Sequence, residues 1–147
     1  MPIAITDWHV AWVRAFLRQD METLKPMLER TSRTNEPDGT TLLLRAAFVE
    51  AVRRRFVGGT RADVVRFVAH SRIRRGRNAP PVDPAVAEKL IMEVLTGTPA
   101  DGLTDLQKGQ HIILLSELVE DEDLTAPELE AFLADARTYA EQVAATL

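Results

Sequence analysis

Residues 42–57 read LLLRAAFVEAVRRRFV, and this stretch decides the fold. Its first two-thirds are apolar on most sides, whereas Arg53, Arg54 and Arg55 stand at its end. A helix that is apolar all round has to be covered by other elements, and cations near a helix C-terminus complement the macrodipole. The stretch therefore predicts a helix over 41–57 that enters the core and emerges at its basic end.

Two further helices are predicted before this one. Apolar residues at helical spacing predict the first over 6–19, with both tryptophans on its apolar stripe. Proline is tolerated in the first turn of a helix but not in its interior, so Pro26 favours Thr23 over Asp20 as the N-cap of the second. This helix is expected to end near Arg33, and the turn-forming residues 34–39 predict a loop.

The rest of the chain carries start and stop signals for helices. Gly58 and Gly59 predict a stop, after which a pattern close to a capping box opens a helix that ends by Gly76. Pro80 and Pro81 interrupt the helical pattern. Beyond them an Asp-Pro pair predicts a helix closed by Gly97, and two capping boxes predict the last two helices. The residues that carry these later signals are Asp83, Pro84, Thr104, Gln107, Thr125 and Glu128.

No run of residues shows the alternation of a β-strand, and no heptad repeat is sustained. The sequence predicts an all-α fold, a compact and roughly orthogonal bundle of about seven helices with no sheet. At 147 residues, the chain is expected to form one domain over 1–147. We divide it into a basic half, 1–77, a proline-rich connection, 78–82, and an acidic half, 83–147.

Charge is strongly polarised along the chain. Residues 1–77 hold 15 Lys and Arg against 8 Asp and Glu, whereas residues 78–147 hold 3 against 14. The chain has no cysteine, which excludes disulfides and thiolate chemistry. The longest apolar runs are far shorter than the roughly 18 residues of a membrane-spanning helix. We therefore expect a cytoplasmic protein that has no membrane partner.

A basic surface on the helix pair 41–77 is the strongest candidate binding site in the sequence. Arg66, His70 and Arg74 stand four residues apart, so they line one ridge of a helix. Guanidinium groups match carboxylates and phosphates bidentately, so the hypothetical ligand is an anion or an acidic partner. The candidate residues are Arg53, Arg54, Arg55, Arg66, His70, Arg74, Arg75 and Arg77.

Catalytic, cofactor and metal motifs are not found. His9, His70 and His111 do not pair at metal-ligand spacing, and the serines stand in no nucleophile motif. His111 shares a helix face with Leu114 and Leu118, which predicts a hydrogen-bonded core histidine. We predict no catalytic residue, no metal site and no cofactor, and the sequence favours a non-enzymatic protein.

Two functions remain open at this point. The first is a protein-interaction or regulatory module that binds a protein partner or self-associates. The alternative is a nucleic-acid-binding regulator that uses the arginine-rich helix pair 41–77 in the manner of a helix-turn-helix. The polarised charge also leaves two possible arrangements of the basic surface. It is either open to solvent or covered by the acidic half.

Overall fold

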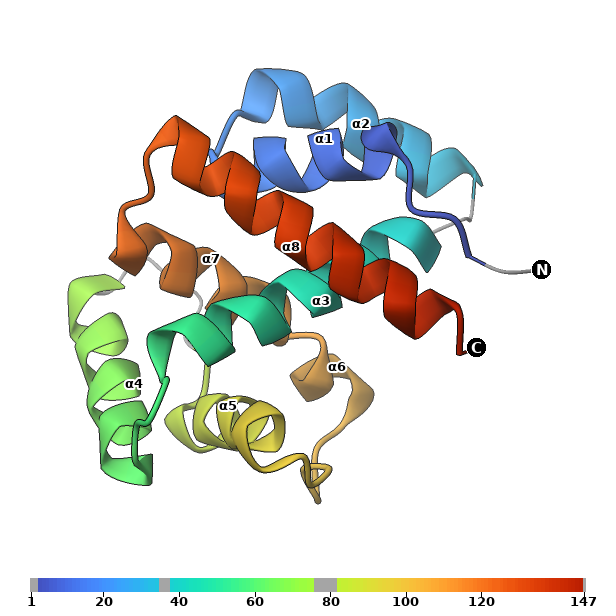
Figure 1. Ribbon diagram of the computed structural model, residues 1–147. Coiled ribbons are helices and arrows are strands. Elements are labelled where there is room, and N and C mark those ends of the chain that lie inside the picture. The colour runs from blue at the N-terminus through green and yellow to red at the C-terminus, as the bar shows by residue number, and fades with distance from the viewer. Residues whose placement is uncertain (1–2, 35–37, 76–81, 147) are drawn as a thin grey trace.

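The structure is a computed structural model that describes residues 3–34, 38–75 and 82–146, without the side chains of 32–34, 38 and 72–75. Within these residues every regular element is a helix, seven of them eleven residues or longer and one of four (Figure 1). This confirms the all-α prediction. The helices are α1 (Asp7–Leu17), α2 (Met21–Thr34), α3 (Asp38–Arg55), α4 (Arg61–Arg75), α5 (Pro84–Thr96), α6 (Asp105–Lys108), α7 (His111–Glu122) and α8 (Ala126–Ala144).

Helix α3 is the central element. Between Leu43 and Val52, every residue except Arg45 and Glu50 is buried, and those two are half-buried. Four helices contact it, namely α1, α5, α7 and α8, and Figure 1 shows α3 running through the middle of the molecule. The helix predicted from the apolar stretch is therefore confirmed, and it is covered over most of its surface, while Arg45 and Glu50 reach solvent.

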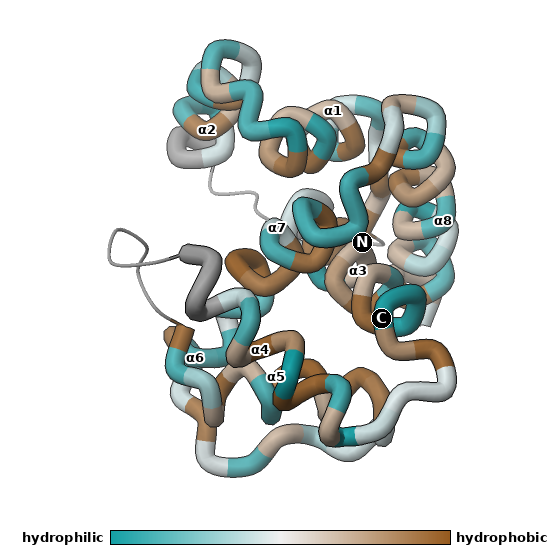
Figure 2. Tube along the Cα trace, turned by 90° about the vertical axis from the view of Figure 1, so that its left-hand side faces the viewer, coloured by the Kyte–Doolittle hydropathy of each residue, from teal (hydrophilic) through white to brown (hydrophobic). Residues whose placement is uncertain are grey.

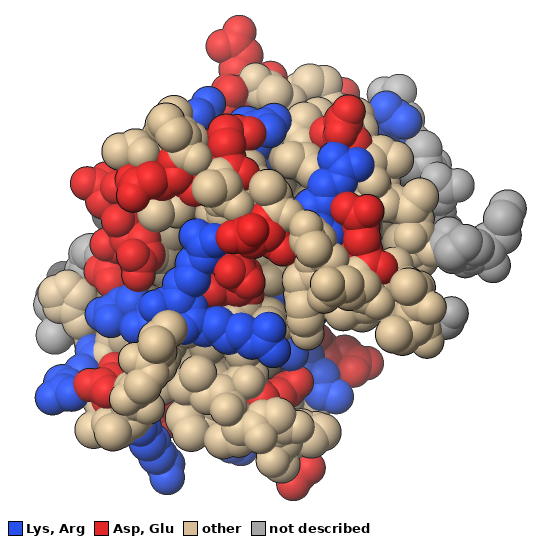
Figure 3. Space-filling view, viewed as in Figure 1, with Lys and Arg blue, Asp and Glu red and all other residues tan. Residues whose placement is uncertain are grey.

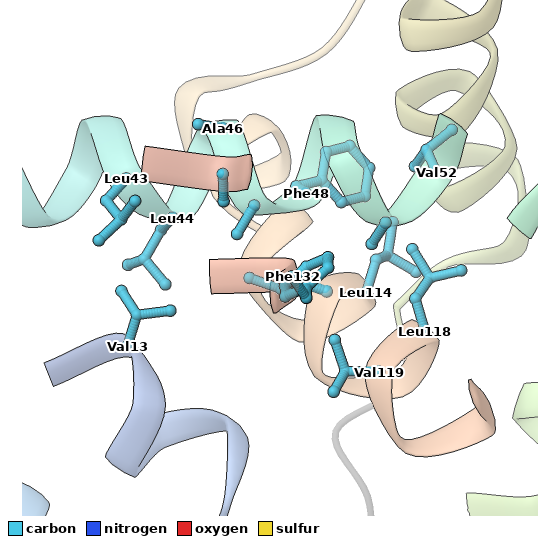
Figure 4. Close-up of a cluster of buried hydrophobic side chains, with 14 of the residues drawn as sticks. Val13, Leu43, Leu44, Ala46, Phe48, Val52, Leu114, Leu118, Val119 and Phe132 are labelled. Carbon is cyan, nitrogen blue, oxygen red and sulfur yellow. The ribbon is translucent and has the colours of Figure 1, made fainter. Parts of the chain in front are cut away.

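The core is built around α3 from aromatic and branched side chains. Phe48 of α3 and Phe132 of α8 are almost completely buried, and Leu114 and Leu118 of α7 lie beside them (Figure 4). Figure 2 shows hydrophobic residues along the helices around α3, and side chains from these helices belong to the same cluster. Small residues, such as Ala47 of α3, leave room for neighbouring helices to approach closely. One hydrophobic cluster thus joins residues from the basic and the acidic half.

Most helix boundaries follow the local signals of the sequence. Asp83 accepts a hydrogen bond from the Ala85 N–H at 2.8 Å, and Gly97 closes α5 with φ = 73°. Thr125 and Glu128 form the expected capping box of α8, in which each side chain bonds the backbone N–H of the other residue. These predictions are confirmed. The sequence could predict them because a cap depends only on residues within one helical turn.

The predicted start of the second helix is wrong. Asp20, rather than Thr23, is the N-cap of α2, because its Oδ1 accepts a hydrogen bond from the Thr23 N–H at 3.2 Å. Pro26 therefore lies inside the helix, where it removes the hydrogen bond to the Glu22 carbonyl. Both residues are exposed, so water hydrates this carbonyl and lowers the cost of the proline.

The start of α3 also differs from the prediction. The helix begins at Asp38, three residues before the predicted Thr41, and residues 35–37 of the predicted loop lie outside the described part of the chain. Gly39 lies within the helix, and the imidazole ring of His9 packs closely against it. A side chain at this position would meet that ring, so glycine serves here for close approach.

The capping box at Thr104 opens a shorter helix than expected. Helix α6 ends at Lys108, and α7 starts only at His111. The His111 ring forms a hydrogen bond with the Lys108 carbonyl, with Nδ1 at 2.9 Å from the oxygen. The Ile112 N–H donates to the Gly109 carbonyl instead of to that of Lys108. This side-chain bond replaces the backbone bond that would continue α6 into α7.

No helix of the described residues is long and apolar enough to cross a membrane.

Replacing Gly39 by alanine tests the contact between α1 and α3. Alanine favours a helix by about 1 kcal/mol over glycine, but its Cβ would overlap the His9 ring. Overpacking typically costs about 1–3 kcal/mol, so we expect Gly39→Ala to lower the free energy of unfolding measured in urea.

The double variant His9→Ala with Gly39→Ala is the control. Removal of the ring should make the second alanine neutral or stabilising relative to His9→Ala alone. Equal effects of Gly39→Ala in both backgrounds would contradict the proposed contact.

Candidate binding surfaces

The three arginines at the end of α3 lie against the acidic half. Arg54 pairs with Asp135 of α8 at 2.6 Å, and Arg55 pairs with Asp121 of α7 at 3.1 Å. Arg53 places its guanidinium 5.2 Å from the centre of the Tyr139 ring. Figure 3 shows the same arrangement as a band of Lys and Arg side chains bordered by Asp and Glu.

These arginines therefore contact partners in the acidic half, but their side chains are not buried. The side chains of Arg54 and Arg55 are 36% and 37% exposed, so each ion pair contributes little to stability, about 0–1 kcal/mol. The larger effect is on charge, because the carboxylates of α7 and α8 neutralise this part of the predicted basic surface. For the end of α3, the acidic half covers the arginines in part.

The candidate residues on α4 lie apart from this set. Arg66 is exposed, with 74% of its side chain accessible, and pairs with Asp63 one turn earlier. His70 is exposed on the same helix. The side chains of Arg74 and Arg75, like the whole of Arg77, lie outside what the structure describes, so their part in a common surface stays a prediction.

Helix α4 has a packed face and an open one. On the packed face Ser71 donates a hydrogen bond to the buried carboxylate of Glu117 in α7, and Phe67 meets Phe56 edge to face. The opposite side we call the α4 face, and it has no acidic residue among its fully exposed positions; Asp63 at its border is half-buried. The α4 face consists of Arg61, Ala62, Val65, Arg66, Ala69 and His70.

A shallow hollow joins the α4 face to α5. It has a volume of about 330 Å³, and we call it the α4–α5 groove. Ala85 and Met92 give it an apolar floor, and Arg61 belongs both to the groove and to the α4 face. The lining residues are Arg61, Ala85, Glu88, Lys89 and Met92.

A second hollow, of about 300 Å³, brings together charged residues that the sequence did not mark as a site. We call it the polar hollow. It lies between α3, α5 and the start of α7, and the segment after α5 closes one side of it. Its lining residues are Arg45, Leu90, Glu93, Pro99, Ala100, Lys108 and His111.

Glu93 organises the polar hollow. Its Oε1 accepts a hydrogen bond from Arg45 Nη2 at 3.0 Å, and its Oε2 accepts one from the Ala100 N–H at 3.2 Å. The carboxylate thus fixes both the guanidinium of α3 and the segment that follows α5. The Arg45 guanidinium also lies 5.5 Å from the centre of the Phe48 ring, which restricts it further.

His111 is hydrogen-bonded, as predicted, but it is half-buried at the edge of the core rather than fully within it. Burial lowers its pKa below the ordinary 6.5, and the nearby Arg45 lowers it further, whereas the Lys108 carbonyl and Glu93 act in the opposite direction. In the neutral ring Nδ1–H donates to the Lys108 carbonyl, which leaves Nε2 as an acceptor. Nε2 is buried and has no hydrogen-bond partner among the described residues.

Sequence analysis missed the polar hollow for a definite reason. Arg45, Glu93 and His111 are separated by 48 and 18 positions, so no spacing rule connects them. Glu93 stands next to the apolar stripe of α5. A charged residue beside an apolar stripe was the one local signal that it has an oppositely charged partner on another helix. In the described part of the chain, no three His, Asp or Glu side chains come together as a metal site.

No protein-family model matches this chain, and no curated protein sequence or solved structure resembles it closely enough to count as a match.

The lowered pKa of His111 predicts how stability changes with pH. Above about pH 6.5 the ring is neutral in both the folded and the unfolded chain. As the pH falls below this value, the unfolded chain takes up a proton that the folded chain does not, so the free energy of unfolding decreases. The decrease should level off once the pH lies below the folded pKa, and NMR of the ring Hε1 resonance gives that pKa directly.

His111→Gln serves as the comparison for this measurement. His9, whose pKa is also lowered, is present in both proteins and cancels. The variant should lose part of the decrease in stability between pH 7.5 and 5.5, and identical pH profiles would show that His111 does not titrate abnormally.

Proposed function

We propose that the protein is a non-enzymatic regulatory module that binds an acidic helical segment of a partner protein on the α4 face and in the α4–α5 groove. The observation that carries the proposal is the open side of α4, where two arginines flank an exposed apolar strip and a hollow adjoins it. Helices commonly bind in apolar grooves between two helices of another protein.

The apolar part of the surface fits the side chains of a helix. Val65 is 41% exposed, one turn after Arg61, and Ala62 and Ala69 lie above and below it on the same side of α4. Small residues at these positions would let the backbone of a partner approach. The groove next to Arg61 has room for one large apolar side chain of the partner.

The charged part of the surface favours an acidic partner. Arg61 and Lys89 stand at the rim of the groove, and Arg66 extends the positive charge along α4. Glu88 and Asp63 offset part of this charge, which leaves a small positive excess. Complementary charge of this kind raises the association rate and fixes the orientation of the partner more than it raises affinity.

The alternative remains a nucleic-acid-binding regulator that uses the helix pair 41–77. The exposure of Arg66 and His70 favours it. Three observations weigh against it: Arg54 and Arg55 at the end of α3 are paired with acids, α4 contains no Asn or Gln, and the chain carries a net charge of −4.

Binding of synthetic peptides to the full-length protein tests the proposal. The probes are acidic amphipathic helices that carry leucines on one side and glutamates on the other, with several leucine spacings. We expect saturable binding by fluorescence anisotropy. Val65→Ser should weaken it roughly tenfold, as for a contact near the centre of an interface, and Arg61→Glu with Arg66→Glu should weaken it further and remove its salt dependence.

Two exposed residues of α2, at the opposite end of the molecule, provide matched controls. Met21→Ser removes an apolar side chain, and Lys25→Glu reverses a charge, and neither should change peptide binding. Binding of duplex DNA that Arg61→Glu with Arg66→Glu abolishes, but Val65→Ser leaves intact, would overturn the proposal in favour of the nucleic-acid alternative. A wild-type dimer that Val65→Ser dissociates would identify a second copy of the chain as the occupant instead.

A further inference from the structure

We propose that the polar hollow is a binding site for a small monocarboxylate with an apolar body. It is formed by Arg45, Glu93, Lys108 and His111 around the apolar residues Leu90 and Pro99. The site is separate from the α4–α5 groove, with which it shares no lining residue. The proposal therefore does not depend on the function proposed for α4.

The first argument is the balance of charge. Arg45 and Lys108 bring two positive charges to the hollow, and Glu93 brings one negative charge. His111 adds no charge at neutral pH, because its ring is held in the neutral form. The lining thus has an excess of one positive charge, which a single carboxylate neutralises, whereas a dianion such as phosphate would leave one negative charge uncompensated and face about twice the repulsion of Glu93.

The second argument is preorganisation of the cations. Glu93 and the Phe48 ring hold the Arg45 guanidinium in place, and its hydrogen bond to Glu93 uses only Nη2. The other N–H groups of the fork stay available for a carboxylate. Lys108 is exposed at the edge of the hollow, and its ammonium makes no ion pair with any described residue. A ligand carboxylate between these two side chains would therefore be bound from both sides.

The third argument concerns size and polarity. A volume of about 300 Å³ lies at the lower end of the range of small-molecule sites. Leu90, Pro99 and Ala100 supply apolar surface next to the cations, so the ligand should carry an aromatic or branched apolar group beside its carboxylate. A lone carboxylate, that of Glu93, makes the hollow a poor site for a metal ion, because hard cations require several oxygen ligands.

The test uses phenylacetate as the probe and phenylacetamide as its neutral counterpart, with the full-length protein. Isothermal titration calorimetry should show saturable binding of phenylacetate and at least tenfold weaker binding of the amide. In ¹⁵N NMR spectra, the Ala100 amide should shift during the titration, which places the ligand in the polar hollow. Isovalerate and indole-3-acetate extend the probes to smaller and larger apolar groups.

Lys108→Gln is the decisive variant, because the residue is exposed and makes no hydrogen bond through its side chain in the described structure, so the fold should be retained. Loss of one charge-assisted contact should weaken phenylacetate binding about tenfold, while Lys25→Gln on α2 should have no effect. Equal binding of acid and amide, an unchanged affinity of Lys108→Gln, shifts confined to the α4–α5 groove, or no binding of any of the three carboxylates would each overturn the proposal.

Discussion

The enclosure of α3 is the constraint on which the rest of the structure depends. A helix in which positions 46–49 are all buried exposes little of its surface to water, so neighbouring helices have to surround most of it. Helices from both halves of the chain do so, and they share one hydrophobic cluster with α3. Small residues such as Ala47 and Ala51 permit close approach, while Phe48 fills the space between the neighbours.

The same constraint determines where charge is found. Because α3 is covered along most of its length, its polar residues are confined to its end and to a few half-buried positions. Arg54 and Arg55 emerge beside α7 and α8, where carboxylates pair with them. Arg45 remains within the body of the molecule, and Glu93 and Phe48 hold it at the wall of the polar hollow. Charge polarisation along the sequence is thus partly resolved inside the molecule, whereas Arg61 and Arg66 of α4 remain exposed.

How far the sequence predicts this structure depends on the range of each interaction. Caps such as Asp83 and Thr125 were predictable because they act within one helical turn. The buried character of α3 was predictable from a stretch that is apolar on most sides. Long-range contacts were not predictable: the packing of His9 on Gly39 joins α1 to α3, which are far apart in the sequence. The polar hollow joins residues from four helices, α3, α5, α6 and α7, and no local pattern connects them.

Native-state hydrogen exchange tests the central position of α3 most directly. Because the side chains at 46–49 and 51–52 of α3 are buried, the amides between Ala46 and Val52 should exchange only when the whole molecule unfolds. Their exchange free energies should then equal the free energy of global unfolding measured with denaturant, and α2, which packs mainly on α1, should exchange faster. Amides of α3 that exchange as fast as those of α2, while α8 stays protected, would contradict this account.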